Sequence, residues 1–302
     1  VRVLDRLPDG RLRITNPPEA GQKKRVRQVE AVVEPDLVYP LVRGRDVDRW
    51  FVEVGDRYII VPHNPRTGKP LPEAELKVKY PKTYEYLYNF RGELENRSIH
   101  RLWGKGAPFY TVYDIGDYTF APYKVVWKYI AGEISGKAEF SCAVVEPIND
   151  RYLGTRIVIP NEKLMLVPFQ SADEAYYVAG VLNSSLVRSI VASYTIETEI
   201  STHILDVIKV PRYDPGNEVH RRIAALSRRA HELARCIHAK VKPEYCRGIE
   251  DPKAELGRVE EELDRAVGQL YGLSESAVEE FRKLLAILSG EEVEESSVEE
   301  ER

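Results

Sequence analysis

The sequence has few of the features that mark secreted or membrane proteins. It contains 3 cysteines, 1 methionine and 4 glutamines among 302 residues. Three cysteines are too few for a disulfide framework, so we expect a reducing compartment, the cytoplasm. There is no uninterrupted run of about 18 apolar residues and no basic-then-apolar leader, so we expect no export and no membrane partner. The scarcity of glutamine beside abundant Glu, Arg and Lys hints at a thermophilic source.

The net charge of −4 is distributed unevenly along the chain. Residues 291–302 contain seven glutamates and one arginine, a contribution of −6 that leaves +2 for the rest. Basic residues gather at 23–27, 43–49 and 221–229. An acidic tail beside basic clusters is compatible with a polyanion-binding body, although ordinary solvated faces would produce the same charges.

The pattern of apolar residues predicts an α+β fold: a β-rich body with inserted helices, followed by a helical C-terminal region. We expect the body over 1–170, the helical region over 171–290 and a disordered acidic tail over 291–302. Asp9 and Gly10 separate two short apolar runs, which predicts a hairpin. Further strands are predicted at 58–61, 111–113, 124–127, 143–145 and 156–159, and a helix from Pro81.

From Ser171 onwards the apolar period becomes helical. Ser171 and Glu174 have the spacing of a capping box before the first helix. Apolar residues then recur at helical spacing in 175–186, 219–237, 256–270 and 278–288. Gly272 and Ser274 are suited to end one helix and cap the next.

Three patterns of catalytic or metal-binding type occur, and each has a simpler interpretation. The run Asn16-Pro-Pro-Glu19 resembles the catalytic tetrapeptide of adenine-N6 DNA methyltransferases, but Glu19 cannot stack on a flipped base and only 104–106 offers nearby glycines. A turn is the favoured interpretation. Asp36 with Glu75 and Lys77 has the letters of a metal-dependent nuclease, but 71–77 is expected to be a loop.

A zinc site is the third pattern, at the end of a predicted helix. Its four residues lack any Cys-x-x-Cys pair, so a packed thiol and solvent histidines are favoured. The residues are His231, Cys236, His238 and Cys246. We therefore predict no catalytic, cofactor-binding or metal-binding residues in this chain.

The aromatic residues are interleaved with cations in two segments, 101–110 and 123–129. Cations neutralise phosphates, and flat side chains pack against sugars and bases. A tyrosine-rich core with lysines at strand edges would give the same pattern.

Six short segments, each weak alone, occur in a fixed order over residues 30–285. They are LVYPLVRGRDVDRW (37–50), YIIVP (58–62), YPKTYEYL (80–87), AYYVAGVLNSS (175–185), IKVP (208–211) and EELDRAVGQLYGL (261–273). This set resembles the TaqI-like C-terminal specificity domain of adenine-specific DNA methyltransferases and fused type II restriction-modification enzymes.

The resemblance implies a target-recognition domain that reads the DNA major groove and holds the duplex against a separate methyltransferase catalytic domain or subunit. Such a catalytic domain would bind S-adenosylmethionine. Because the cofactor loop and a true catalytic tetrapeptide are missing, this chain resembles the specificity part alone. It is expected to be either a piece of a longer protein or a stand-alone subunit.

Two arginines around a glycine, Arg43-Gly44-Arg45, suit a loop that approaches a DNA backbone or a guanine edge. Local ion pairs among Arg45, Asp46, Asp48 and Arg49 are the simpler alternative. The predicted DNA-binding residues are Arg43, Arg45, Arg101, Trp103, Lys105, Lys124 and Lys128. Two other functions remain open: the metal-dependent nuclease, and a structural subunit of a DNA-modification complex.

Overall fold

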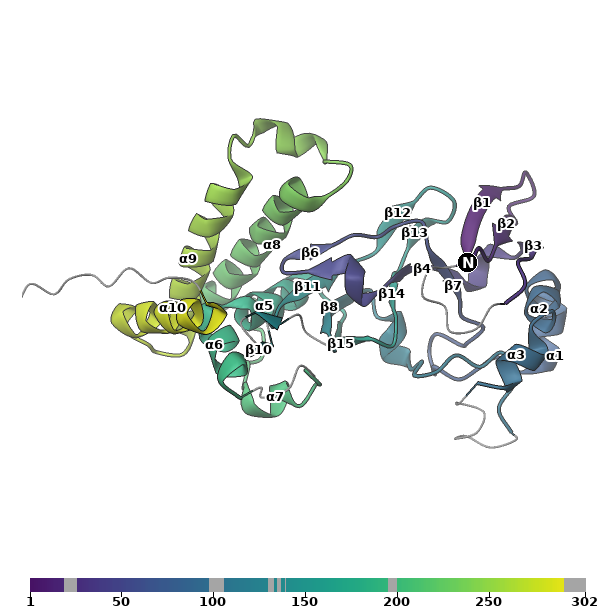
Figure 1. Ribbon diagram of the computed structural model, residues 1–302, viewed down its shortest axis with the longest axis horizontal. Coiled ribbons are helices and arrows are strands. Elements are labelled where there is room, and N and C mark those ends of the chain that lie inside the picture. Colours follow the sequence, from purple (N-terminus) through teal and green to yellow (C-terminus); the bar gives the residue numbers. More distant parts are fainter. Residues whose placement is uncertain are drawn as a thin grey trace, which may run out of the picture. The chain divides into compact units, whose positions relative to one another are not determined.

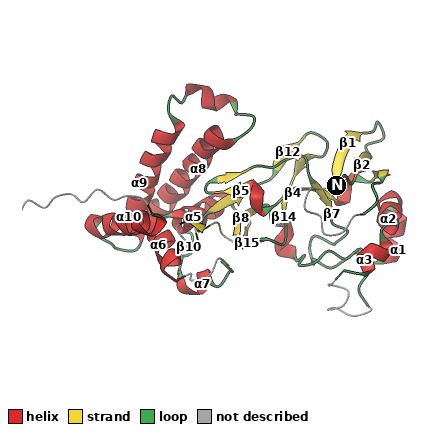
Figure 2. Cartoon of the chain, viewed as in Figure 1, coloured by secondary structure: helices red, strands yellow, loops and turns green. Residues whose placement is uncertain are grey.

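The computed structural model describes residues 1–18, 26–97, 106–129, 133–134, 137–138, 140–194 and 200–290. They combine helices and strands, which confirms the predicted α+β class (Figure 1, Figure 2). The chain divides into two compact units. Unit 1 comprises 1–46, 53–124 and 145–162, and unit 2 comprises 47–52, 125–144 and 163–302. The segments 47–52 and 125–144 thus lie with the helices, whereas the sequence places them in a continuous body over 1–170.

Unit 1 contains short strands and three helices that follow one another along the chain. Its strands are β1 (Arg2–Arg6), β2 (Leu12–Thr15), β3 (Glu30–Val33), β4 (Val38–Val42), β7 (Tyr58–Ile60), β12 (Ile148–Asp150), β13 (Gly154–Arg156) and β14 (Ile159–Pro160). They form an antiparallel β1-β2-β3 sheet, a β12-β13 hairpin and a β14-β4-β7 sheet in which β14 is parallel to β4. The helices are α1 (Glu73–Lys79), α2 (Pro81–Tyr88) and α3 (Arg91–Glu95).

The predicted N-terminal hairpin is confirmed. Strands β1 and β2 pair in antiparallel register around the turn at Asp9 and Gly10. Gly10 has a φ of 86°, in the left-handed region that glycine adopts without steric cost. Inward-facing Val3, Leu12 and Ile14 are buried, so the hairpin closes one side of the unit 1 core.

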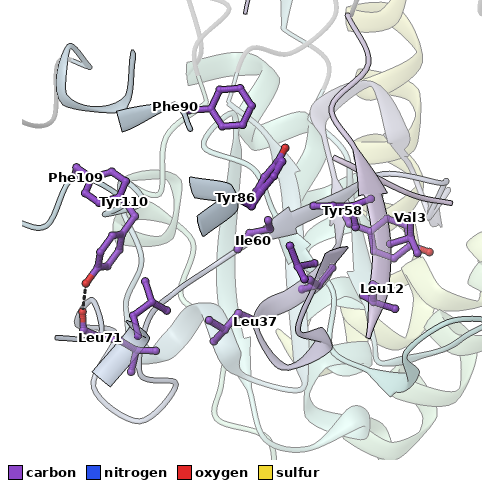
Figure 3. Packing of buried hydrophobic residues seen from close by; sticks show 14 residues of the cluster. Val3, Leu12, Leu37, Tyr58, Ile60, Leu71, Tyr86, Phe90, Phe109 and Tyr110 are labelled. Atoms are coloured by element: carbon purple, nitrogen blue, oxygen red, sulfur yellow. Dashed lines mark hydrogen bonds between the residues drawn. The ribbon is translucent and has the colours of Figure 1, made fainter. Parts of the chain in front are cut away.

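The core of unit 1 joins this sheet to the helices α1 and α2. Its buried members include Leu12, Tyr58, Leu76 and Tyr86. Figure 3 shows the Tyr110 hydroxyl pointing at the Leu71 carbonyl, to which it donates a hydrogen bond of 2.6 Å. A buried phenol needs such a partner, because an unpaired polar group in a core is costly.

Unit 2 combines short strands with long helices. Its strands are β5 (Val47–Asp48), β6 (Phe51–Val52), β8 (Tyr123–Lys128), β9 (Glu133–Ile134), β10 (Lys137–Ala138), β11 (Cys142–Val145) and β15 (Leu164–Phe169), with β8 central in a β11-β8-β15 sheet. The first residues of β8 and the last of β11 belong to unit 1. The helices are α5 (Ala172–Asn183), α6 (Ser185–Tyr194), α7 (Ile204–Val207), α8 (Glu218–His238), α9 (Pro252–Leu270) and α10 (Glu275–Ser289).

Helix α8 packs on both α5 and α9, and the α8–α9 pair lies side by side in Figure 1. Gly180 of α5 permits the close approach to α8, since a Cβ there would lie 2.8 Å from a methyl carbon of Ile223. The long helices are capped by side chains: Asn217 for α8, Asp251 for α9 and Ser274 for α10. Within the described residues, no helix is both long enough and apolar enough to cross a membrane.

Several local expectations are wrong. Residues 111–113 are not a strand, and 73–79 are the helix α1 rather than a loop. Ser171 precedes α5 as predicted, but its side chain makes no capping hydrogen bond. The strand predicted over 156–159 is divided between β13 and β14.

His231 lies at the centre of unit 2 rather than in solvent as the sequence suggests. Its Nε2 accepts a 2.9 Å hydrogen bond from the Val144 amide, so its Nδ1 carries the proton that is donated to the Ser227 carbonyl at 2.7 Å. Its ring meets Trp50 and Tyr176 edge to face. Burial lowers the pKa of His231 to about 4.

Replacing His231 with Gln should flatten the dependence of unfolding free energy on pH. In the unfolded chain a histidine has a pKa near 6.5, above the folded value, so the folded state favours the neutral ring. The stabilisation is complete above pH 6.5 and is lost as pH falls through about 4, an effect on the order of 3 kcal/mol. Urea denaturation followed by tryptophan fluorescence at several pH values measures it.

The matched control is His203→Gln, because the His203 side chain is exposed. That variant should keep the wild-type pH dependence. An equal slope for wild type and His231→Gln would contradict the buried neutral imidazole.

A disulfide joins Cys236, near the end of α8, to Cys246. This corrects the expectation of a packed thiol at Cys236 and weakens the inference of a reducing compartment. The bond closes the connection between α8 and α9, which restricts the unfolded chain. Cys142 is a free thiol, buried in unit 2.

Changing Cys236 and Cys246 together to Ser should lower the free energy of unfolding by about 2–3 kcal/mol, because the unfolded chain regains loop entropy. Thermal unfolding with and without a reductant measures this. The reductant should destabilise the wild type and have no further effect on the double variant. A reductant-insensitive wild type would count against the bond.

Candidate nucleic-acid interface

The Arg43-Gly44-Arg45 turn lies between β4 and β5 as a short 3₁₀ turn at 44–46. Asp46 orders it: its Oδ2 accepts from the Arg43 amide at 3.0 Å and from the Arg43 Nε at 3.2 Å. Arg45 is different, since its side chain is 62% exposed and its Nε is 4.0 Å from Asp46. The turn therefore presents Arg45 to solvent and holds Arg43 half-buried.

Gly44 has no steric neighbour within the described chain, because a Cβ there would meet nothing within 4 Å. No internal contact demands glycine at this position. The absence of a side chain leaves the backbone between the two arginines open to a close approach from outside.

Lys124 is a correction. It is fully buried in unit 1, and its Nζ donates to the carbonyls of Ala121 (2.6 Å) and Val158 (3.0 Å). Burial lowers the pKa of Lys124 to about 7. An ammonium enclosed by carbonyls cannot reach a phosphate, so its role is structural.

Lys128 belongs to unit 2 and remains accessible. Its Nζ forms a 2.9 Å ion pair with Asp48, and both side chains are partly exposed. The remaining predicted DNA-binding residues, Arg101, Trp103 and Lys105, lie outside the described residues.

The arginines of α8 are paired with carboxylates on neighbouring helices. Arg228 pairs with Asp173 of α5 at 2.8 Å, and Arg222 pairs with Glu262 of α9 at 2.8 Å. Arg229 bonds both Glu255 and Glu232. The basic run at 221–229 is thus largely neutralised within unit 2, and it does not form an open cationic face.

The predicted local pairs around Arg49 are replaced by a longer-range contact. Arg49 and the Trp50 indole both donate to Glu260 of α9, the indole at 2.6 Å. Trp50 has a φ of 63° and is buried, so the β5–β6 turn is fixed against the helices.

Asn16 is a structural clasp. Its Nδ2 donates to the Arg27 carbonyl and its Oδ1 accepts from the Val29 amide, both at 2.9 Å. Both ends of the amide are therefore used internally, which favours the turn interpretation over a catalytic role. Gly106 is described as a turn, while 104–105 lie outside the described residues.

The nuclease residues have other partners. Glu75 pairs with Lys79 at 2.7 Å and Lys77 with Glu73 at 2.8 Å, on the surface of α1. Asp36 lies in the short turn 35–37. Among the described residues, no group of three or more His, Cys, Asp or Glu side chains could hold a metal ion.

Sequence reasoning missed a second cationic feature in unit 1, made by Arg6 of β1 and Arg151 of the β12–β13 turn. These residues are 145 positions apart, so no run of charge reveals them. The only local signal is the turn pattern Asp150-Arg-Tyr-Leu-Gly154.

Comparison with known proteins finds partial similarity to type II DNA methyltransferases. The chain is 24% identical over 166 residues to type II methyltransferase M.NspV from a Nostoc species, covering 53% of this chain and 30% of that protein. It is also 24% identical over 156 residues to type II methyltransferase M.MjaIV from Methanocaldococcus jannaschii, covering 52% of this chain and 47% of that protein. The alignments thus span less than half of either relative. No family model matches the chain.

Lys124→Met should lower the free energy of unfolding, on the order of 1–3 kcal/mol, because two buried carbonyls lose their donor. Lys128→Ala should change it by less than about 1 kcal/mol, since the lost ion pair is partly exposed. Urea denaturation at neutral pH compares the two. If Lys124→Met were as stable as Lys128→Ala, the two carbonyl bonds would not matter.

Proposed function

We propose that this chain is the target-recognition part of a type II, adenine-N6-specific DNA methyltransferase of a restriction-modification system. The carrying observation is its similarity, over about half its length, to two type II methyltransferases. The ordered segments that resemble the TaqI-like specificity domain support the finer assignment to a recognition module. The partner would be double-stranded DNA.

The Arg43–Arg45 turn is the part of unit 1 best suited to touch DNA bases. A guanidinium presents a planar pair of donors that matches the O6 and N7 acceptors of guanine in the major groove. Arg45 is exposed enough to do this, and Asp46 fixes the backbone beneath it. Phosphate contacts from cations such as Lys128 would add affinity without reading sequence.

We assign methyl transfer to a separate catalytic domain or subunit, which would bind S-adenosylmethionine. The residues described here give no fit for that role, because the Asn16 amide is already bonded at both ends. In the proposed complex, the recognition part positions the duplex and the catalytic partner acts on the flipped adenine.

Fluorescence anisotropy of the chain with a set of duplexes tests the proposal. Binding should weaken steeply with salt, by about 0.9 log units per log unit of salt for each phosphate contact. Arg45→Ala should cost on the order of 1–3 kcal/mol on the preferred duplex and relax preference at one base.

Arg66→Ala is the control, because Arg66 is an exposed arginine in another turn of unit 1. It should bind like the wild type. A chain that binds no duplex at low salt would overturn the proposal. Binding with no base preference in either protein would overturn the recognition role.

A further inference from the structure

The turn of the β12–β13 hairpin is held in one conformation by Asp150. Its Oδ1 accepts from the amides of Tyr152 (2.8 Å) and Leu153 (2.9 Å), and its Oδ2 accepts from the Tyr58 hydroxyl at 2.7 Å. Gly154 completes the turn with a φ of 69°. Because the carboxylate is engaged on both oxygens, the turn is fixed to the β7 strand beneath it.

Tyr152 links this turn to the edge strand β1. Its hydroxyl donates to the Leu4 carbonyl at 3.2 Å, and its own carbonyl accepts from the Arg6 Nη1 at 3.0 Å. The Arg151 guanidinium lies 4.4 Å from the centroid of the Tyr152 ring. One tyrosine therefore positions two guanidinium groups, one through its backbone and one through its ring.

The charges of these two arginines are not neutralised nearby. Arg6 and Arg151 are exposed, and neither forms an ion pair with a carboxylate anywhere in the described part of the chain. Arg2, with Asp56 at 3.4 Å, and Arg57 add to the same region. Burial lowers the pKa of Arg57, and the charge of Arg2 lowers it further, so these cations feel one another.

The contrast with α8 is informative, because its arginines have carboxylate partners on α5 and α9. The region also adjoins the Arg43–Arg45 turn through the backbone. The Leu41 amide donates to the Arg57 carbonyl at 2.9 Å, two residues before Arg43. Both cationic features therefore belong to the same end of the β4–β7 ladder.

We propose that Arg6 and Arg151, held in place by Tyr152, form a second contact surface for the phosphate backbone of duplex DNA. This rests on the proposed function and assigns it a surface away from the Arg43–Arg45 turn. Prepositioned guanidiniums bind phosphate oxygens well, because little side-chain freedom is lost on contact. The surface would supply affinity rather than base recognition.

The test compares salt dependence in the whole chain carrying Arg6→Gln and Arg151→Gln. Anisotropy with a fluorescent duplex is measured at about 50 and 200 mM salt. Losing two phosphate contacts should reduce the loss of affinity between these conditions by about tenfold relative to wild type. Arg151→Lys keeps the charge and should retain the wild-type salt dependence, and Arg66→Gln is the surface control.

If wild type binds duplex DNA and the double variant has the same salt dependence, this surface is overturned while the recognition function stands. If wild type binds no duplex, both proposals fail. Loss of polyglutamate binding without loss of duplex binding would assign the surface to an acidic protein and also overturn it. Should the double variant fail to fold, the single Arg151→Gln variant decides, because its side chain only stacks on a ring.

Discussion

A single uncharged imidazole joins the helices of unit 2 to its strands. His231 comes from α8, yet its two ring nitrogens bond the backbone of β11 and of its own helix. Its ring also contacts Trp50 in the β5–β6 turn and Tyr176 in α5. A charged ring would lose the acceptor nitrogen and pay for desolvation, so this arrangement requires the neutral form. The segment 47–52 is held among the helices by the same contact and by Glu260.

Carboxylate placement decides which cationic residues remain open to an anion. The longest run of arginines, on α8, lies beside acidic side chains of α5 and α9 and is neutralised there. In unit 1, Arg45, Arg6 and Arg151 are exposed on turns and an edge strand. Turns can hold a guanidinium against solvent because the backbone is fixed below it, here by Asp46 and Asp150. The proposed DNA contacts therefore come from isolated arginines rather than from the basic runs.

The partial similarity to type II methyltransferases fits a division of labour. The alignments span 30% and 47% of the two relatives, so the whole proteins contain much that this chain does not match. In this chain, the one segment with catalytic letters uses Asn16 to join 27–29 to the end of β2. A recognition part needs rigid turns with exposed donors, and that is what Asp46 and Asp150 provide.

Local physical rules were sufficient for much of the fold. The α+β class, the hairpin at Gly10 and the long helices from 172, 218, 252 and 275 follow from periodicity, turn residues and caps, which act over a few residues. Burial and pairing depend on distant segments, so they required the tertiary structure. It buried Lys124 among carbonyls, joined Cys236 to Cys246 and gave the α8 arginines their partners. It also brought Arg6 beside Arg151, because a hydrogen bond between a strand and a distant turn leaves no periodic trace in the sequence.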